Sequence, residues 1–341
     1  MSQDTLSDVL RTVRLRSALF FDLSCGGAWL AEAPGSKDLA ALVMPEVDQV
    51  IDYHVVTEGE CWIAIQGEPP LRLRRGDIVI LPFGDPHVVS SAPGMRAEPG
   101  VDWYREMKLH NRPFRVAHKD GRPLGPESCG GEPGRDYTVD TSVICGFIGC
   151  DRRPFNPLLA TLPRLLHLPA DDGRSWGAQF AQLAAAESAV QSPGREAMLE
   201  RLSEMMFVDA VRRHIDRMPE QSTGWLAGLR DRYVGRALAL MHEEPAAPWS
   251  MDELGHKVGL SRSALHERFV DFIGVPPMQY LTQWRMQLAS RLLRESQSTV
   301  LSIALRIGYD SEAAFGRAFK RLVGMPPAAW RRQQGQARIT E

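Results

Sequence analysis

Two stretches in the last third of the chain follow the same pattern, offset by 50 residues. In each, a serine (Ser261 or Ser311) precedes a helical run of apolar residues that ends at a glycine (Gly274 or Gly324). Serine is a favoured helix N-cap, and glycine readily adopts the left-handed conformation that ends a helix. A shorter apolar helix precedes each serine. The repeat therefore predicts two helix-turn-helix units.

The apolar spacing sets the bounds of the expected helices. The first unit is expected over 251–258 and 262–272, and the second ends with a helix over 312–322. One helix over 278–294, about 25 Å long at 1.5 Å per residue, joins the units. That separation suits two successive major grooves, which repeat every ~34 Å on duplex DNA. Residues 225–341 carry 16 basic and 11 acidic residues, whereas the remainder has a net charge of −7. This asymmetry indicates a polyanionic partner for the C-terminal part.

The segment Ile303 to Arg331, which reads IALRIGYDSEAAFGRAFKRLVGMPPAAWR, resembles the signature of the AraC/XylS family of transcription regulators. The first unit, ELGHKVGLSRSALHERF followed by WRMQLASRLL, is similar to that family's first half. The resemblance covers about 110 residues. It implies a module that reads two adjacent major grooves of double-stranded DNA and usually activates transcription beside RNA polymerase.

The resemblance also implies base-contacting roles for the outward residues of both second helices. These are Arg262, Ser263, His266 and Glu267 in the first unit, and Glu312, Ala313 and Arg317 in the second. Arg317 is the firmest of them, since arginine pairs bidentately with guanine O6 and N7. Glu267 departs from the more basic residue common in the family, and would accept from cytosine N4. The basic residues Lys320, Arg321, Arg331 and Arg332 are predicted to contact phosphates, which position the protein without specifying sequence. The alternative for each is a solvated helix face.

The first 170 residues have a different pattern. Residues 71–74 alternate apolar and polar side chains, and residues 78–81 form a short apolar run bounded by turn residues. Both are typical of β-strands. Residues 91–136 are rich in proline, glycine and charge and are predicted to be an irregular insertion. The sequence thus predicts a small barrel or sandwich.

The segment Gly76 to His87 fits G-x5-P-x-G-x2-H, which resembles the second motif of the cupin family. His54 and Glu60 fall at the first and last ligand positions of the first motif, where Val56 replaces the second histidine. The resemblance implies a two-histidine, one-carboxylate set of His54, Glu60 and His87, suited to Fe(II) or a similar divalent ion. Two interpretations stay open: a barrel that has lost its metal, or one that holds it. A cupin metalloenzyme or metal sensor with an accessory DNA-binding domain is the alternative to a non-enzymatic regulator.

Five cysteines, an odd number at irregular spacing, argue against a structural disulfide framework. The segments Val143 to Gly146 and Asn156 to Pro163 resemble a cupin-bearing subgroup of AraC regulators. That resemblance implies a small-molecule or oxidant effector and redox-sensing candidates at Cys25 and Cys145, with Cys150 close enough in sequence to resolve an oxidised Cys145. The alternative for each cysteine is a small buried hydrophobe.

The expected architecture is α+β, with a cupin-like β-barrel, a helical hairpin and an all-α double helix-turn-helix domain. The expected bounds are 1–170 for the sensor domain, 171–218 for the hairpin, 219–224 for a linker and 225–335 for the DNA-binding domain. The hairpin is predicted to cap the barrel, transmit its signal or form a homodimer. Neither a signal peptide nor an apolar run of about 18 residues is found. We therefore expect a cytoplasmic protein without a membrane partner.

Overall fold

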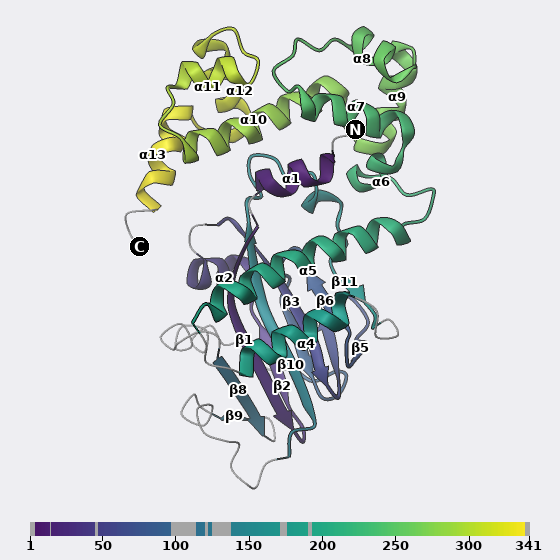
Figure 1. Ribbon diagram of the computed structural model, residues 1–341, viewed down its shortest axis with the longest axis vertical. Helices are drawn as coiled ribbons and strands as arrows, with labels where there is room; N and C mark the ends of the chain where they lie inside the picture. Colours follow the sequence, from purple (N-terminus) through teal and green to yellow (C-terminus); the bar gives the residue numbers. More distant parts are fainter. Residues whose placement is uncertain are drawn as a thin grey trace. The chain divides into compact units, whose positions relative to one another are not determined.

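The computed structural model (Figure 1) describes residues 4–13, 15–44, 47–96, 114–119, 122–124, 138–170, 176–189 and 193–337. The chain forms two compact units of α+β architecture, as predicted. The barrel unit comprises Leu15–Cys150 and Pro163–His214, and the helical unit comprises Met1–Arg14, Asp151–Leu162 and Ile215–Glu341. The predicted boundaries placed 1–14 and 151–162 with the barrel, whereas both segments belong to the helical unit.

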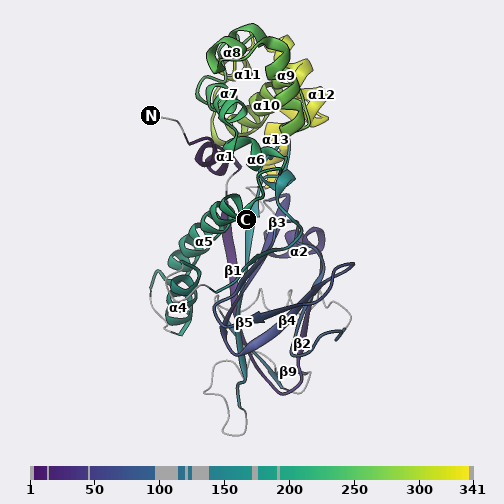
Figure 2. The same ribbon diagram turned by 90° about the vertical axis from the view of Figure 1, so that its right-hand side faces the viewer.

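Two sheets build the barrel unit (Figure 2). The first has the strand order β11-β6-β3-β10-β1-β8-β9, and the second has the order β2-β7-β4-β5. The strands are β1 Arg16–Gly26, β2 Leu30–Ala33, β3 Gln49–Glu58, β4 Glu60–Ile65, β5 Leu71–Arg74, β6 Ile78–Leu81, β7 His87–Ser90, β8 Phe114–Lys119, β9 Arg122–Leu124, β10 Thr141–Cys150 and β11 Leu166–Leu168. Val56 and Val79 of the first sheet share one core with Ile63 and Leu73 of the second. Helix α2 (Ser36–Val43) adds Leu39 to it.

The predicted strands over 71–74 and 78–81 are confirmed as β5 and β6. The prediction of irregular structure over 91–136 is wrong for β8 and β9. Strand β8 pairs in parallel with β1, and β9 pairs with β8. The alternation of Phe114 and Val116 with polar neighbours was a strand signal inside a proline- and glycine-rich stretch. Residues 97–113 and 125–137 lie outside the described part of the chain.

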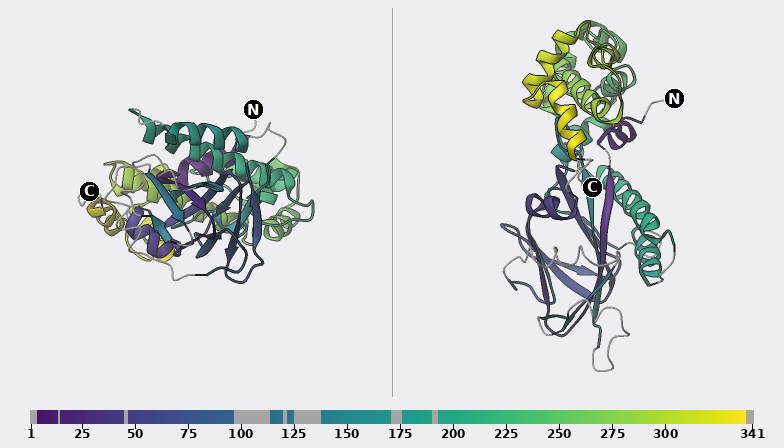
Figure 3. Two further views of the ribbon diagram at one scale, coloured as in Figure 1. Left: turned by 90° about the horizontal axis from the view of Figure 1, so that it is seen from below. Right: turned by 90° about the vertical axis from the view of Figure 1, so that its left-hand side faces the viewer.

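Helices α4 (Trp176–Ala189) and α5 (Arg195–Arg217) form the predicted hairpin, and their barrel-unit portions lie across the seven-stranded sheet (Figure 3, left). Tyr53 of β3 joins both helices to this sheet. Its hydroxyl lies 2.7 Å from Ser203 Oγ, and its ring meets Phe180 edge-on at 6.3 Å. Gly146 makes room for this side chain, since a Cβ there would lie 2.3 Å from the Tyr53 hydroxyl oxygen. The hairpin thus caps the sheet.

Three large apolar side chains of the hairpin face solvent. Leu183, Met198 and Met205 are 52%, 54% and 46% exposed. Exposed apolar side chains mark an interaction surface where they form a contiguous patch. They are consistent with the homodimer expected from the sequence of the hairpin, which stays a prediction.

The helical unit contains both helix-turn-helix units (Figure 1). Its helices are α1 Thr5–Val13, α6 Trp225–Arg230, α7 Arg232–Glu243, α8 Met251–Val258, α9 Arg262–Ile273, α10 Pro277–Glu295, α11 Val300–Arg306, α12 Glu312–Val323 and α13 Pro327–Ala337. Helices α8 and α9 form the first unit, α11 and α12 form the second, and α10 runs between them. Ser261 accepts from Ala264 N and Ser311 from Ala314 N, while Gly274 and Gly324 end their helices in the left-handed conformation. The predicted repeat is confirmed.

Aromatic side chains fill the core of the second unit. Phe315, Phe319 and Trp330 are buried and stack edge-on in sequence, with ring centroids 5.5 and 6.2 Å apart. Substituting such residues with alanine typically costs about 3–5 kcal/mol. No helix among the described residues combines the length and apolar character needed to cross a membrane.

Candidate nucleic-acid interface and barrel interior

Helix α9 presents a polar face beside a buried apolar one. Leu265 and Phe269 are fully buried against the rest of the unit. The four residues predicted to contact bases, Arg262, Ser263, His266 and Glu267, are all exposed. Arg262 lies 3.5 Å from Asp252 Oδ2, and both side chains are more than two-thirds exposed. Such an open pair is weak, so it does not prevent Arg262 from engaging DNA.

Helix α12 repeats this arrangement. Phe315 and Phe319 are buried, whereas the five predicted contact residues, Glu312, Ala313, Arg317, Lys320 and Arg321, are exposed. Within the described chain, Arg317 makes no hydrogen bond or ion pair. Its five guanidinium donors are free to meet a planar acceptor such as a guanine edge.

Arg331 has a different role from the predicted one. Its Nε donates to Leu293 O at 3.1 Å, and its Nη2 donates to Ser298 O at 2.6 Å. These carbonyls lie at the end of α10 and in the connection to α11. The guanidinium therefore holds this connection instead of extending to phosphates. Arg332, its neighbour, is exposed.

Arg285 of α10 joins the central helix to both helix-turn-helix units. Its Nε donates to Pro245 O at 2.6 Å and its Nη2 to Ala247 O at 2.8 Å, in the loop that leads to α8. Its Nη1 donates to Gly308 O at 3.5 Å, in the turn between α11 and α12. Helix α10 has 19 residues and spans ~28 Å. Sequence reasoning missed this role, because backbone carbonyls leave no mark in the sequence.

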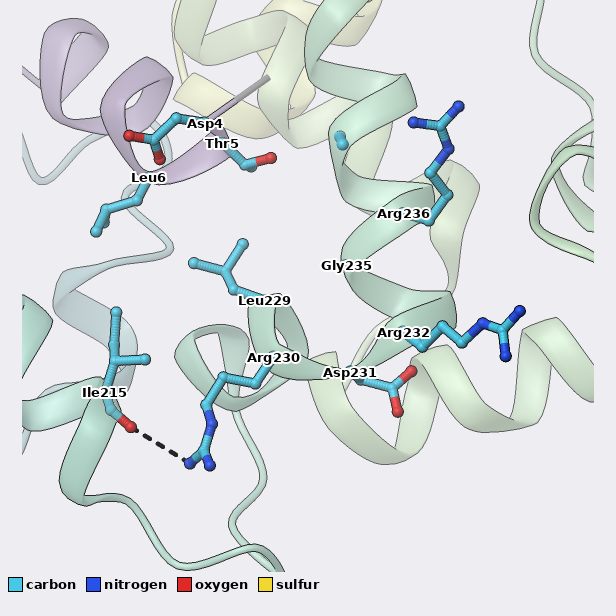
Figure 4. Close-up of a pocket in the computed structure, with 11 residues that line it drawn as sticks. Asp4, Thr5, Leu6, Ile215, Leu229, Arg230, Asp231, Arg232, Gly235 and Arg236 are labelled. Atoms are coloured by element: carbon cyan, nitrogen blue, oxygen red, sulfur yellow. Dashed lines mark hydrogen bonds between the residues drawn. The ribbon is translucent and has the colours of Figure 1, made fainter. Parts of the chain in front are cut away.

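A pocket of about 590 Å³ lies within the helical unit, where α1, the end of α5 and the α6–α7 turn meet (Figure 4). Five of the eleven residues that line it are charged, among them Asp4, Arg230 and Arg236. Arg230 Nη1 donates to Ile215 O at 3.3 Å, and Asp231 pairs with Arg268 and caps α7. The volume of the pocket suits a small ligand, although small-molecule sites usually have a more apolar lining than this one.

The barrel interior holds a chain of hydrogen bonds. His87 Nδ1 donates to Asp85 O at 2.8 Å, since a carbonyl oxygen only accepts. Burial keeps both imidazoles neutral: it lowers the pKa of His54 well below its ordinary value and that of His87 to about 4. His87 Nε2 must then accept from His54 Nε2, 2.7 Å away. His54 Nδ1 accepts in turn from the Cys145 thiol, whose Sγ lies 3.0 Å away. The donors in this series of hydrogen bonds therefore all point the same way, from the Cys145 thiol to the Asp85 carbonyl oxygen.

The side chain of Asp52 lies beside His87 in this series of hydrogen bonds. Neither of its buried carboxyl oxygens has a hydrogen-bond partner within the described residues, and its Oδ2 lies 3.8 Å from His87 Nδ1. Burial raises the pKa of Asp52 well above its ordinary value and so favours the neutral acid.

The predicted metal set is corrected by the position of Glu60. The Glu60 carboxylate is 51% exposed and binds Arg72 Nη2, with an Oε2 distance of 2.7 Å. This ion pair lowers the pKa of Glu60. In β4, Cys61 and Ile63 point inward, so strand alternation sends Glu60 outward. His54 and His87 do meet inside, but no group of three or more His, Cys, Asp or Glu in the described residues could hold a metal ion. The residues present do not fit a cupin metal centre.

The described cysteines Cys25, Cys61, Cys145 and Cys150 are free thiols and at most 1% exposed. Burial raises the pKa of Cys25 and Cys145 well above the ordinary value, and that of Cys61 to about 12. All three are thiols at pH 7, which disfavours direct attack on an oxidant. Cys129 lies outside the described residues.

The geometry excludes Cys150 as a resolving partner for Cys145 in the folded barrel. Both residues lie on β10, five positions apart. That separation amounts to ~16 Å along a strand. A disulfide requires a Cα distance below about 7 Å.

Comparisons with known proteins agree with this two-part organisation. A cupin family model matches residues 4–216, and a helix-turn-helix domain model matches residues 254–333. A Streptomyces lividans protein described as an AraC-like transcription regulator is 32% identical over 331 residues, which is 96% of this chain and 98% of its own. The HTH-type transcriptional regulator AlkR of Acinetobacter baylyi is 28% identical, with 97% and 99% covered. The RCS-specific HTH-type transcriptional activator RclR of Escherichia coli is 24% identical, with 84% and 86% covered.

Proposed function

The chain belongs to the AraC family of DNA-binding transcription regulators that carry an N-terminal cupin domain, and from this premise we propose that it activates transcription from an operator read in two successive major grooves. The observation that supports this proposal is the pair of exposed helix faces on α9 and α12, which are joined by one ~28 Å helix. RNA polymerase is the proposed partner, in line with the name of the activator from E. coli.

The two helices take different shares of recognition. Arg317 reads a guanine, while Glu312 and Ala313 flank it. In the first unit, Arg262, His266 and Glu267 offer donors and an acceptor, and Ser263 makes a weaker contact. Lys320 and Arg321 lie one turn beyond Arg317 and neutralise phosphates, which positions α12 without selecting a sequence.

Selection of duplexes from random DNA by the full-length protein tests this proposal. We expect one selected duplex to bind at least ~10³-fold more tightly than a shuffled duplex, with affinity falling steeply as salt rises. Transcription with purified RNA polymerase should then increase when the selected duplex stands upstream of a promoter. Equal affinity for selected and shuffled duplexes would contradict DNA reading. Reduced transcription would instead indicate a repressor.

For the input, we propose that the barrel senses an oxidant through Cys145. The supporting observation is its hydrogen bond to His54 Nδ1, the atom that would take the thiol proton once the barrel opens to solvent and sulfur attacks a peroxide. The peroxide O–O bond breaks, one oxygen becomes a sulfenic acid on Cys145, and the other leaves as water with that proton. The burial of Cys145 means that the barrel must open first. A small-molecule effector is the second candidate input, with the 590 Å³ pocket as its site.

Mass spectrometry of the peroxide-treated protein tests the oxidant proposal. We expect a gain of one oxygen on Cys145, and loss of the reporter response in Cys145→Ser. Cys61→Ser, which alters another buried cysteine of the same core, is the matched control and should respond like the wild type. A reporter response retained in Cys145→Ser would rule out this thiol as the sensor. Loss of the response in Cys25→Ser alone would move the role to that residue.

The competing class, a cupin metalloenzyme or metal sensor, loses its main support because Glu60 does not join His54 and His87. The matched relatives are transcription regulators, which is consistent with a non-enzymatic protein.

A further inference from the structure

Residues 151–157, here called the strap, lie along one face of the central helix α10. Three residues of α10 receive it: Tyr280, Gln287 and Arg294, spaced seven apart and therefore on one side of the helix. Arg294 holds Asp151 through two hydrogen bonds of 3.1 and 2.5 Å. Phe155 meets the other two, donating from its backbone N to Gln287 Oε1 at 3.1 Å and placing its ring edge-on against Tyr280 at 5.4 Å.

These contacts are buried. The Asp151 and Arg294 side chains are 6% and 7% exposed, and Tyr280 and Gln287 are fully buried. Asn156 stiffens the strap, since its Nδ2 donates to Asp151 O and its Oδ1 accepts from Leu159 N. A buried charged pair is costly to break from one side, because the remaining charge has no solvent to compensate it. The strap is therefore a fixed part of the helical unit.

The strap leaves the DNA-reading faces open. Its contacts on α10 involve none of the exposed residues of α9 and α12 that are proposed to meet DNA. A different residue of α10, Arg285, ties that helix to both helix-turn-helix units. The strap cannot block DNA by covering the reading residues, so any influence on binding must pass through α10.

The strap is also continuous with the sheet of the barrel unit. Asp151 directly follows Cys150, the last residue of β10. Its backbone N donates to Val13 O at the end of α1, at 2.9 Å, and α1 leads into β1. Strands β1 and β10 are paired, with Arg16 opposite Gly149. Two neighbouring strands of one sheet thus run directly into segments that pack in the helical unit.

We propose that the strap is a positioning element for DNA reading. The Asp151–Arg294 pair couples the position of α10, and hence the spacing of the two reading helices, to the conformation of β10. This inference rests on the proposed reading of two successive grooves. It gives the barrel a route to the DNA-binding module that requires no occlusion of the reading faces. Asp151, Phe155 and Arg294 act through α10 and touch no base.

The test uses full-length Asp151→Asn and Arg294→Lys, each close in shape to the native residue. Arg291→Met is the matched control, because Arg291 lies on the same helix and forms an exposed pair with Glu295. Affinity is measured for the selected duplex and for duplexes with one base pair added or removed between its two half-sites. The half-sites are the segments read by α9 and by α12. We expect the wild type and Arg291→Met to reject altered spacings strongly. The strap variants should lose about tenfold of that discrimination.

Each outcome decides the matter. Strap variants that lose affinity equally for all spacings have only a structural defect, which overturns the proposal. Tighter binding by these variants would show an inhibitory strap and also overturn it. If thermal melting shows that Asp151→Asn is not folded, the test uses Arg294→Lys alone. A wild-type protein that selects no duplex refutes the proposed function, whereas a selective wild type whose strap variants reject altered spacings equally well refutes this inference alone.

Discussion

Arg317→Ala should weaken binding to the selected duplex by about 1–3 kcal/mol, and should relax specificity mainly at one base pair. The guanidinium is exposed on α12 and has no protein partner within the described residues, so its removal leaves no internal defect. All of the loss therefore belongs to the DNA contact. Affinities for duplexes substituted at each position, measured for wild type and variant, would locate the guanine it reads.

Two other residues proposed to contact DNA, Lys320 of α12 and Arg262 of α9, provide the comparison. Lys320→Ala should weaken binding to all duplexes alike and reduce the salt slope by about one. Arg262→Ala should weaken binding in a sequence-dependent way, as Arg317→Ala does, because its exposed pair with Asp252 is weak and leaves the guanidinium available to DNA. If Arg317→Ala weakened all sequences equally, with a reduced salt slope, Arg317 would be a phosphate contact and the assignment of bases to α12 would fail.

The parts of this fold that sequence reasoning predicted well are those set by local physics. Ser261 and Gly274 act on their own helix, and so do Ser311 and Gly324, so capping and apolar spacing gave helix bounds correct to within one residue. The exposed residues of α9 and α12 follow from the same periodicity. No partner distant in the sequence was needed to place them.

The parts that sequence reasoning missed depend on distant partners. Asp151 and Arg294 are 143 residues apart, and neither stands out in its own neighbourhood. Arg285 binds carbonyl groups, which every residue carries. Glu60 is a different case, because the signal was present: Cys61 and Ile63 alternate inward on β4, which sends Glu60 to the surface. The resemblance to a metal motif outweighed that alternation.

Arg285→Met should lower the free energy of unfolding of the helical unit by about 2–3 kcal/mol, although Arg285 is not one of the predicted base-contacting residues. The change leaves the carbonyls of Pro245, Ala247 and Gly308 without their charged donor. The turn at Gly308 accepts only glycine, because its φ is +85° and a Cβ there would lie 2.5 Å from Ala246 O. Urea unfolding, with hydrogen exchange of α10 to localise the change, measures this effect.

Arg285→Lys separates charge from geometry. Lysine keeps the positive charge, but a single ammonium lacks the planar fork that reaches several carbonyls at once, so we expect an intermediate loss. Arg291→Met on the same helix removes an exposed arginine and should change stability by less than about 0.5 kcal/mol. A loss in Arg285→Met no larger than in Arg291→Met would mean that the three carbonyls find water instead. The rigidity of α10 against the two reading units would then have to come from apolar packing alone.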